Sequence, residues 1–186
     1  MMHQRISKKI TIYILIFFIL VTITNYKLSS NFYIIKQLNI NGLNKIETEK
    51  IYNELLVFKD TNIFSFDKKN ISQRIYSNDI VEEFEIYKIY PSTLNIEIKK
   101  TKFLAITNKN NDNFLVGSNG KLIEMKNTSL DLPYIFGNIN VNNFLNLKRI
   151  IDKSKLDFNE IKELYYFKSN RWDIVTKNGL NIKMPQ

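Results

Sequence analysis

The spacing of hydrophobic positions changes along the chain and divides it into three parts. The first part contains residues 10–26, a run with no charge, glycine or proline. A helix of this length covers about 26 Å, close to the hydrocarbon thickness of about 30 Å, so the run predicts a membrane-spanning helix. A cleaved signal peptide should end in small residues, and here only Leu28-Ser29-Ser30 offers a poor cleavage site. We therefore favour an uncleaved anchor over a signal peptide.

Basic residues flank this run. Arg5, Lys8 and Lys9 precede it, Lys27 follows it, and no acidic residue occurs before Glu47. The positive-inside rule then predicts that residues 1–9 form a cytoplasmic tail and that the rest of the chain lies across the membrane. The expected topology is single-pass, type II, with the lipid bilayer as one partner.

The second part alternates between strand and helix patterns. The order strand, helix, helix, strand, strand predicts an α+β unit in which two helices cover one face of a three-stranded sheet. Asp67 is the expected N-cap of the second helix, and Pro91 suits a turn between the last two strands. The predicted elements are a strand in 32–43, helices at 47–58 and after Asp67, and strands at 81–90 and 94–98.

The third part begins near Lys102 and contains shorter strands. It predicts a mostly β unit with one helix, because polar turn residues separate brief apolar runs. In the last strand Leu180, Ile182 and Met184 alternate with Asn181 and Lys183, which predicts one face in the core. The predicted elements are strands at 103–107, 113–116, 122–125, 161–168, 171–176 and 180–184, and a helix at 143–154.

Composition excludes several classes of function. The chain carries 27 basic and 18 acidic residues, and the basic excess is spread along it, so no Arg-rich stripe favours nucleic-acid binding. There is no cysteine, and His3 in the predicted tail is the only histidine. Thiol and imidazole chemistry are therefore excluded from the part of the chain that is predicted to lie across the membrane. Nothing indicates a cofactor or a small-molecule substrate.

Two local patterns imitate chemical sites. Ser65-Phe66-Asp67-Lys68 matches the S-x-x-K pair of penicillin-binding enzymes, but it lacks their supporting motifs and better fits a loop before an Asp67-capped helix. Glu82, Glu83 and Glu85 could attract a cation, but neighbouring strand residues point to opposite faces, which favours a solvated rim. We predict no catalytic, cofactor or metal site.

The only tryptophan, Trp172, is either a core anchor or an exposed binding residue. Of the two, the core is favoured.

Several stretches together resemble the FtsQ/DivIB family of bacterial cell-division proteins. Most specific are the Y-P-S-T-L hairpin at 90–94 and the R-W-D-I-V-T-K-N-G-L ending at 171–180; the others are 40–46, 62–67, 113–123 and 132–137. The resemblance implies a POTRA domain at residues 32–101 and an FtsQ-type β domain at residues 102–186. The chain departs from the family pattern in two places. The linker at 100–105 keeps only Ala105 of the usual pattern. Family members usually continue beyond the position of Pro185, so the β domain is expected to be incomplete.

The resemblance also implies a function. We expect a non-catalytic scaffold in the cell inner membrane that recruits and links divisome proteins at the septum, namely proteins of the FtsB and FtsL type and septal wall synthesis proteins. Since the family's next strand is missing, the partner-binding edge is expected at Leu180, Asn181, Ile182, Lys183 and Met184. The alternatives are a POTRA component of protein translocation or outer-membrane assembly, and, in another class, a membrane-anchored cell-wall enzyme.

Overall fold

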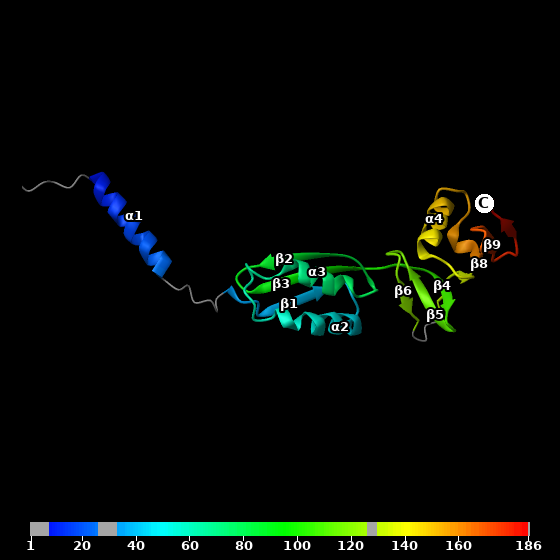
Figure 1. Ribbon diagram of the computed structural model, residues 1–186, viewed down its shortest axis with the longest axis horizontal. Helices are drawn as coiled ribbons and strands as arrows, with labels where there is room; N and C mark the ends of the chain where they lie inside the picture. Colours follow the sequence, from blue (N-terminus) through cyan, green and yellow to red (C-terminus); the bar gives the residue numbers. More distant parts are fainter. Residues whose placement is uncertain (1–7, 26–32, 126–129, 186) are drawn as a thin grey trace, which may run out of the picture.

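The computed structural model describes residues 8–25, 33–125 and 130–185, which form one separate helix and two packed units (Figure 1). The separate helix is α1, Lys8–Asn25. It contains most of the predicted span, whereas Tyr26, Arg5 and Lys27 lie outside the described residues.

Within the described ranges, no helix is long and apolar enough to cross a membrane, so the span predicted at residues 10–26 is not found there.

The N-terminal unit is a three-stranded sheet in the order β1-β3-β2, with two helices against it. The central strand β3 runs parallel to β1 and antiparallel to β2, so the predicted α+β arrangement is confirmed. Its elements are β1 Gln37–Asn41, α2 Lys45–Leu55, η2 Leu56–Phe58, α3 Lys68–Tyr76, β2 Val81–Ile89 and β3 Thr93–Lys100.

Side-chain caps and one glycine set the boundaries of these elements. Asn44 and Glu47 form a capping box, so α2 begins before Glu47, where the sequence pattern placed its start. Asp67 caps α3 as predicted, accepting from the N–H groups of the second and third helical residues. Gly42 turns the chain after β1 at φ +95°, and a Cβ there would lie 1.8 Å from the carbonyl oxygen of Ile98. Only glycine fits that approach.

The core of this unit lies between the helices and one face of the sheet. Its members are almost fully buried, and they include residues from three of the predicted elements: Ile51 and Leu55 of α2, Ile71 and Ile75 of α3, and Leu94, Ile96 and Ile98 of β3. Burying each such side chain contributes roughly 1.5–3 kcal/mol before the entropy of ordering is subtracted.

The C-terminal unit is a seven-stranded sheet in the order β10-β9-β8-β7-β4-β5-β6, with one long helix. Its elements are β4 Phe103–Lys109, β5 Asp112–Gly117, β6 Leu122–Glu124, β7 Tyr134–Phe136, α4 Val141–Asp152, η3 Phe158–Glu160, β8 Ile161–Tyr166, β9 Trp172–Thr176 and β10 Asn181–Lys183. The mostly β unit with one α-helix is as predicted.

The sequence pattern missed strand β7, which joins the two halves of this sheet. It has three residues and runs parallel to both neighbours, β4 and β8. Three residues are too few for alternation to be recognised. Trp172 is 7% exposed and packs with Phe144 of α4 and Tyr166 of β8, so the core interpretation is confirmed.

Candidate functional site

Strand β10 forms one edge of the seven-stranded sheet. It pairs only with β9, through the antiparallel partners Asn181 with Val175, Ile182 with Ile174, and Lys183 with Asp173. No strand of the described residues lies beyond it. A sheet edge of this kind presents backbone donors and acceptors to which another strand can bind.

The hydrogen bonds at both ends of β10 show which backbone groups face outward. Thr176 N–H donates to the carbonyl oxygen of Leu180, and Met184 N–H donates to that of Trp172, both at 3.0 Å. Because inward and outward groups alternate along an antiparallel strand, the N–H and C=O groups of Asn181 and Lys183 point away from β9. In the described part of the chain these outward groups have no hydrogen-bond partner.

Side chains on β10 only partly follow the predicted alternation. Ile182 and Met184 pack against the core as expected, whereas Leu180 is 56% exposed, so its expected inward position is wrong. Leu180 belongs to the turn before the strand, where its N–H donates to Thr176 Oγ1 at 3.1 Å. The turn therefore directs this side chain to solvent.

A groove of about 380 Å³ lies between α4 and the end of β10. Its walls combine apolar side chains with amides, and the hydroxyl of Tyr166 accepts from Asn143 at 2.8 Å and donates to Asn170 at 2.6 Å. The lining residues are Asn143, Asn146, Leu147, Ile150, Tyr166, Asn170, Trp172, Met184 and Pro185. A strand added to β10 would therefore have a partly apolar pocket beside it for its side chains.

The edge formed by β2 in the N-terminal unit is better protected. This nine-residue strand has a register shift between Val81 and Glu83, and it exposes Glu83, Glu85 and Lys88. Bulges and charges of this kind discourage pairing with a further strand. On β10, Lys183 is the only charge, so β10 is the more accessible edge of the two.

The two units meet at a joint made by the loop between β5 and β6, residues 118–121. The side-chain amide of Asn119 donates to the carbonyl oxygens of Asp79 at 2.7 Å and Val81 at 2.9 Å in the N-terminal unit. Lys121 Nζ lies 3.8 Å from an Asp79 carboxylate oxygen and also donates to the carbonyl oxygens of Tyr76 and Asn78.

Thr101, which joins the two units, lies inside this contact and is 4% exposed. Its hydroxyl oxygen accepts from the N–H of Asn119 at 3.2 Å and lies 3.1 Å from Ser118 Oγ, which donates in turn to Glu82. The sequence predicted only a connection between the strands at 113–116 and 122–125. Polar turn residues give no local indication of their partners about 40 positions earlier in the chain, so the joint was missed.

The three acidic residues Glu82, Glu83 and Glu85 each interact with a different partner. Glu82 accepts from Ser118, Glu83 pairs with Lys99 at 3.0 Å, and Glu85 accepts from Tyr87. Among the described residues, no three metal-ligating side chains come together.

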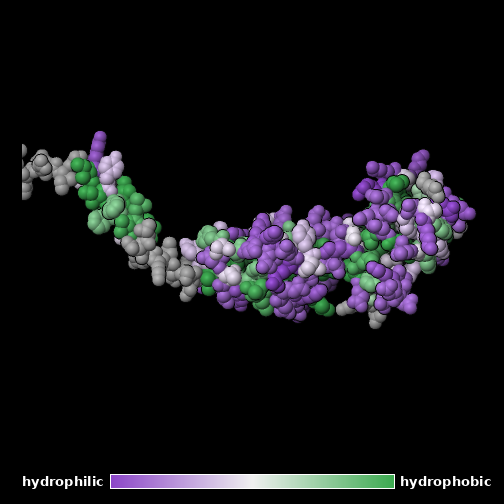
Figure 2. Space-filling model, viewed as in Figure 1, coloured by the Kyte–Doolittle hydropathy of each residue, from purple (hydrophilic) through white to green (hydrophobic). Residues whose placement is uncertain are grey.

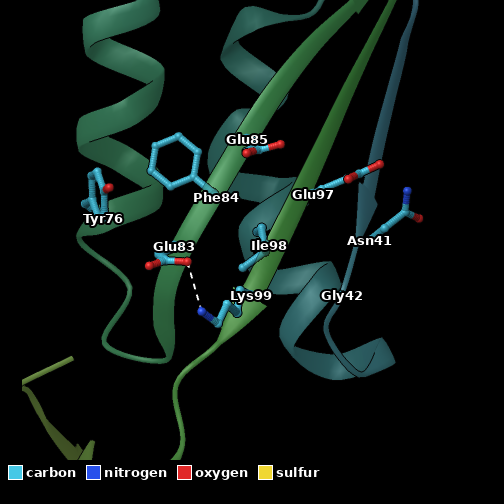
Figure 3. Close-up of a pocket in the computed structure, with 9 residues that line it drawn as sticks. All are labelled: Asn41, Gly42, Tyr76, Glu83, Phe84, Glu85, Glu97, Ile98 and Lys99. Atoms are coloured by element: carbon cyan, nitrogen blue, oxygen red, sulfur yellow. Dashed lines mark hydrogen bonds and ion pairs between the residues drawn. The ribbon is translucent and has the colours of Figure 1, made fainter. Parts of the chain in front are cut away.

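Glu83 and Glu85 line a hollow of about 650 Å³ on β2 and β3, together with Asn41, Gly42, Tyr76, Phe84, Glu97, Ile98 and Lys99 (Figure 3). Within it Glu85 lies directly across from Glu97. The hydrogen bond to Glu85 raises the pKa of Tyr87, and the hydrogen bond to Glu83 raises that of Lys99. The hollow is a charged surface feature in which these donors already satisfy Glu83 and Glu85.

The S-x-x-K pattern lies at the start of α3. Ser65 is in the turn before Asp67, where its N–H donates to the carbonyl oxygen of Asn62, and Lys68 is the first helical residue. This agrees with the interpretation of the segment as a loop before an Asp67-capped helix.

Family models match two adjacent parts of the chain. Residues 34–100 match the POTRA domain, FtsQ-type, and residues 105–186 match Cell division protein FtsQ/DivIB, C-terminal. Together the two matches cover both folded units.

Relatives with these names occur in several bacteria. The chain is similar to the cell division protein DivIB of Staphylococcus aureus (33% identical over 93 residues, 50% of this chain and 21% of that protein) and of Clostridium botulinum strain Hall (30% over 124 residues, 67% and 47%). It is also similar to DivIB of Bacillus subtilis (25% over 166 residues, 88% and 63%). The matched region therefore spans between about a fifth and two thirds of these relatives.

A solved structure is also similar: the major extracytoplasmic domain of the trans isomer of DivIB from Geobacillus stearothermophilus. It is 14% identical with a TM-score of 0.36, and the match covers 46% of this chain and 79% of that one.

Proposed function

Because the chain belongs to the FtsQ/DivIB family of bacterial cell-division proteins, we propose that it is a non-catalytic scaffold that recruits and links division proteins at the septum. Its partners in this proposal are membrane proteins of the FtsB and FtsL type. The two folded parts are proposed to be separate domains, a POTRA domain ending at Thr101 and a β domain starting at Lys102. Two separate cores support that division.

The open edge of β10 is the observation on which this proposal depends. A partner strand could form backbone hydrogen bonds with Asn181 and Lys183 while its side chains enter the groove next to α4. Backbone pairing supplies affinity, and the mixed lining of the groove supplies selectivity. Neither requires a catalytic group.

The joint supports a linking role. Hydrogen bonds from residues 118–121 to residues 76–82 hold the two units in one relative orientation. A partner bound at β10 would then be held at a fixed position relative to the N-terminal unit. Such a fixed geometry raises the effective concentration of two partners bound to the same chain.

We also propose that α1 holds the chain at a membrane. Its large apolar side chains are exposed, with Ile10 at 52% and Phe17 at 64%, and the helix is uncovered and mostly green in Figure 2. Exposed apolar surface on all sides of a helix is unfavourable in water and favourable against lipid. The localisation proposed is accordingly the septal region of the inner membrane.

Co-purification from dividing cells tests the recruitment proposal. Asn181→Pro removes the outward N–H, whereas Asn181→Ala keeps that N–H and removes only the side chain. We expect the proline variant to lose division partners that the alanine variant retains, with both variants folded. Equal recovery of partners by the two variants, or equal loss, would count against strand addition at this edge.

The orientation predicted from the basic N-terminal flank stays a prediction. The chain has no cysteine, so a single cysteine at exposed Ser169 gives a clean label. A membrane-impermeant maleimide should label it in spheroplasts without lysis. Labelling that requires lysis would place the folded units in the cytoplasm.

A further inference from the structure

Three aromatic rings form a cluster at the end of the N-terminal unit where the chain enters it from α1. The ring of Phe64 lies 5.1 Å from that of Tyr33 and stacks at 5.0 Å on that of Tyr90. Phe64 is 57% exposed and Tyr90 55% exposed, although they lie in a unit with a well-packed core. Contiguous exposed rings of this kind are typical of a binding surface.

Backbone hydrogen bonds fix the segments that carry these rings. Ile63 N–H donates to the carbonyl oxygen of Tyr33 at 2.8 Å, and Lys36 N–H donates to that of Ser92 at 2.8 Å. The entry segment, the loop before α3 and the turn between β2 and β3 are therefore held together at one end of the sheet (Figure 1). The cluster is a preformed surface and needs no rearrangement to be presented.

Exposed lysines accompany the rings. Lys36, Lys59 and Lys88 are exposed and, within the described residues, form no ion pair; two exposed acids neighbour this surface in the chain, Asp60 after Lys59 and Asp67 after Phe66. Lys88 Nζ lies 4.6 Å from the ring of Phe66. We call Tyr33, Phe64, Phe66, Tyr90 and these three lysines the aromatic end.

We propose that the aromatic end binds the headgroup region of an anionic lipid bilayer. Tyrosine, with its apolar ring and polar hydroxyl, is enriched at the membrane–water interface, and unpaired lysines are attracted to anionic headgroups. The proposal goes beyond the scaffold function and rests on the proposed attachment of α1 to a membrane.

Chain length makes a bilayer the best-supported occupant of this surface. Only residues 26–32 separate Asn25, the last residue of α1, from Tyr33. A chain of that length reaches at most about 28 Å, so a membrane that holds α1 lies within reach of the aromatic end. Binding there would limit the tilt of the N-terminal unit and, through the joint, set the height of β10 above the membrane.

Fluorescence quenching of the full-length chain in vesicles tests this proposal. Single cysteines at exposed Thr11, Ser65 and Ser169 report on α1, the aromatic end and the turn between β8 and β9 of the C-terminal unit. Each is labelled with a fluorophore, and the vesicles carry lipids with nitroxide headgroups. With equimolar phosphatidylcholine and phosphatidylglycerol, we expect quenching at positions 11 and 65, and little at position 169.

The matched variants separate the aromatic end from general attachment. Phe64→Ser with Tyr90→Ser should abolish quenching at position 65 and leave position 11 unchanged, whereas Phe136→Ser with Phe167→Ser, exposed rings of the C-terminal unit, should change neither. In pure phosphatidylcholine, quenching at position 65 should fall. Partitioning of the aromatic end onto the bilayer should weaken by about fivefold for each lysine that contacts lipid. Lys36→Glu with Lys88→Glu gives the same test without altering the rings.

Each result has a defined meaning. Quenching at 11 without quenching at 65 would overturn the proposal and leave the attachment of α1 intact; it would also point to a protein as the occupant. No quenching at 11 would overturn the attachment of α1. Quenching at 65 that persists in both the serine and the glutamate variants would overturn the assignment to these residues.

Discussion

The side-chain amide of Asn119, in the loop between β5 and β6, donates a 2.9 Å hydrogen bond to the carbonyl oxygen of Val81 at the start of β2. The same amide donates to the carbonyl oxygen of Asp79 at 2.7 Å. One side chain of the C-terminal unit thus satisfies two backbone acceptors of the N-terminal unit. The relative orientation of the two units therefore depends on a few polar groups near the surface.

Substitution of Asn119 should loosen the joint. Asn119→Ala removes both donors at a cost of about 1–2 kcal/mol in the contact between units. Asn119→Asp should cost more, because a carboxylate oxygen would then face the two carbonyl oxygens. NMR relaxation should show the two units tumbling more independently in both variants.

A second asparagine serves as the control for the joint. Asn108→Ala removes a hydrogen bond to Asn113 that lies entirely within the C-terminal unit, and it should leave tumbling unchanged. If Asn119→Asp tumbled as the parent chain does, the joint would be held by other contacts, with Thr101 and Lys121 the next to test.

The two faces of β3 should respond differently to substitution. Ile96 is fully buried between the helices and the sheet, so Ile96→Asp would bury an unpaired carboxylate and should cost more than about 4 kcal/mol. Asn95 lies on the opposite face, where it bonds with Asn41 and Glu97, so Asn95→Ser should cost about 1 kcal/mol or less. Chemical denaturation measures both, and equal losses would contradict the register.

Elements with a strong period were predictable from the sequence. The alternation of Leu94, Ile96 and Ile98 indicates the buried face of β3. The four-residue spacing of Ile71 and Ile75 indicates the buried face of α3. Features that depend on distant partners were not predictable. Strand β7 exists because β4 and β8 lie on either side of it, and no local pattern of three residues indicates that.

The candidate site was predictable where it depends on local alternation and was not predictable where it depends on distant partners. The final strand was expected at a sheet edge, and β10 lies there, but its role in binding stays a prediction. Leu180 was placed on the wrong side because the turn at Asn178-Gly179 continues to it, which alternation alone does not reveal. The joint required knowing that residues 118–121 fold back on residues 76–82, a tertiary contact between polar side chains and backbone.

Acid should weaken the contribution of Glu163 to stability. Tyr165 donates a 2.8 Å hydrogen bond to this carboxylate, and with nearby Lys162 it holds the pKa of Glu163 below its usual value. A lowered folded-state pKa gives stabilisation that is present above the unfolded pKa and is lost as pH falls through the folded pKa. Tyr165→Phe should raise the pKa of Glu163 in an NMR titration and remove this part of the pH dependence.

The control for this titration is Tyr134→Phe. The hydroxyl of Tyr134 lies 3.4 Å from Asn113 Oδ1 and bonds to no carboxylate of the described residues, so its removal should leave the pKa of Glu163 where it was. An unchanged pKa in Tyr165→Phe would mean that Lys162, at 3.2 Å, is the main cause of the shift.

Hydrogen exchange should reveal the open edge of β10 residue by residue. The amides of Asn181 and Lys183 point away from β9 and should exchange quickly in the isolated chain, whereas those of Ile182 and Met184, which face β9, should be protected. The two sets of amides lie side by side in the same short segment, so general fraying would affect both equally. The protected set is therefore an internal control for the fast-exchanging set. Ile182→Pro, which removes an inward donor, should release the protected set and detach β10, while Asn181→Pro should leave it protected. Strong protection of Asn181 and Lys183 in the monomeric chain would show that the edge is already covered, and partner recruitment would then have to use another surface of the protein.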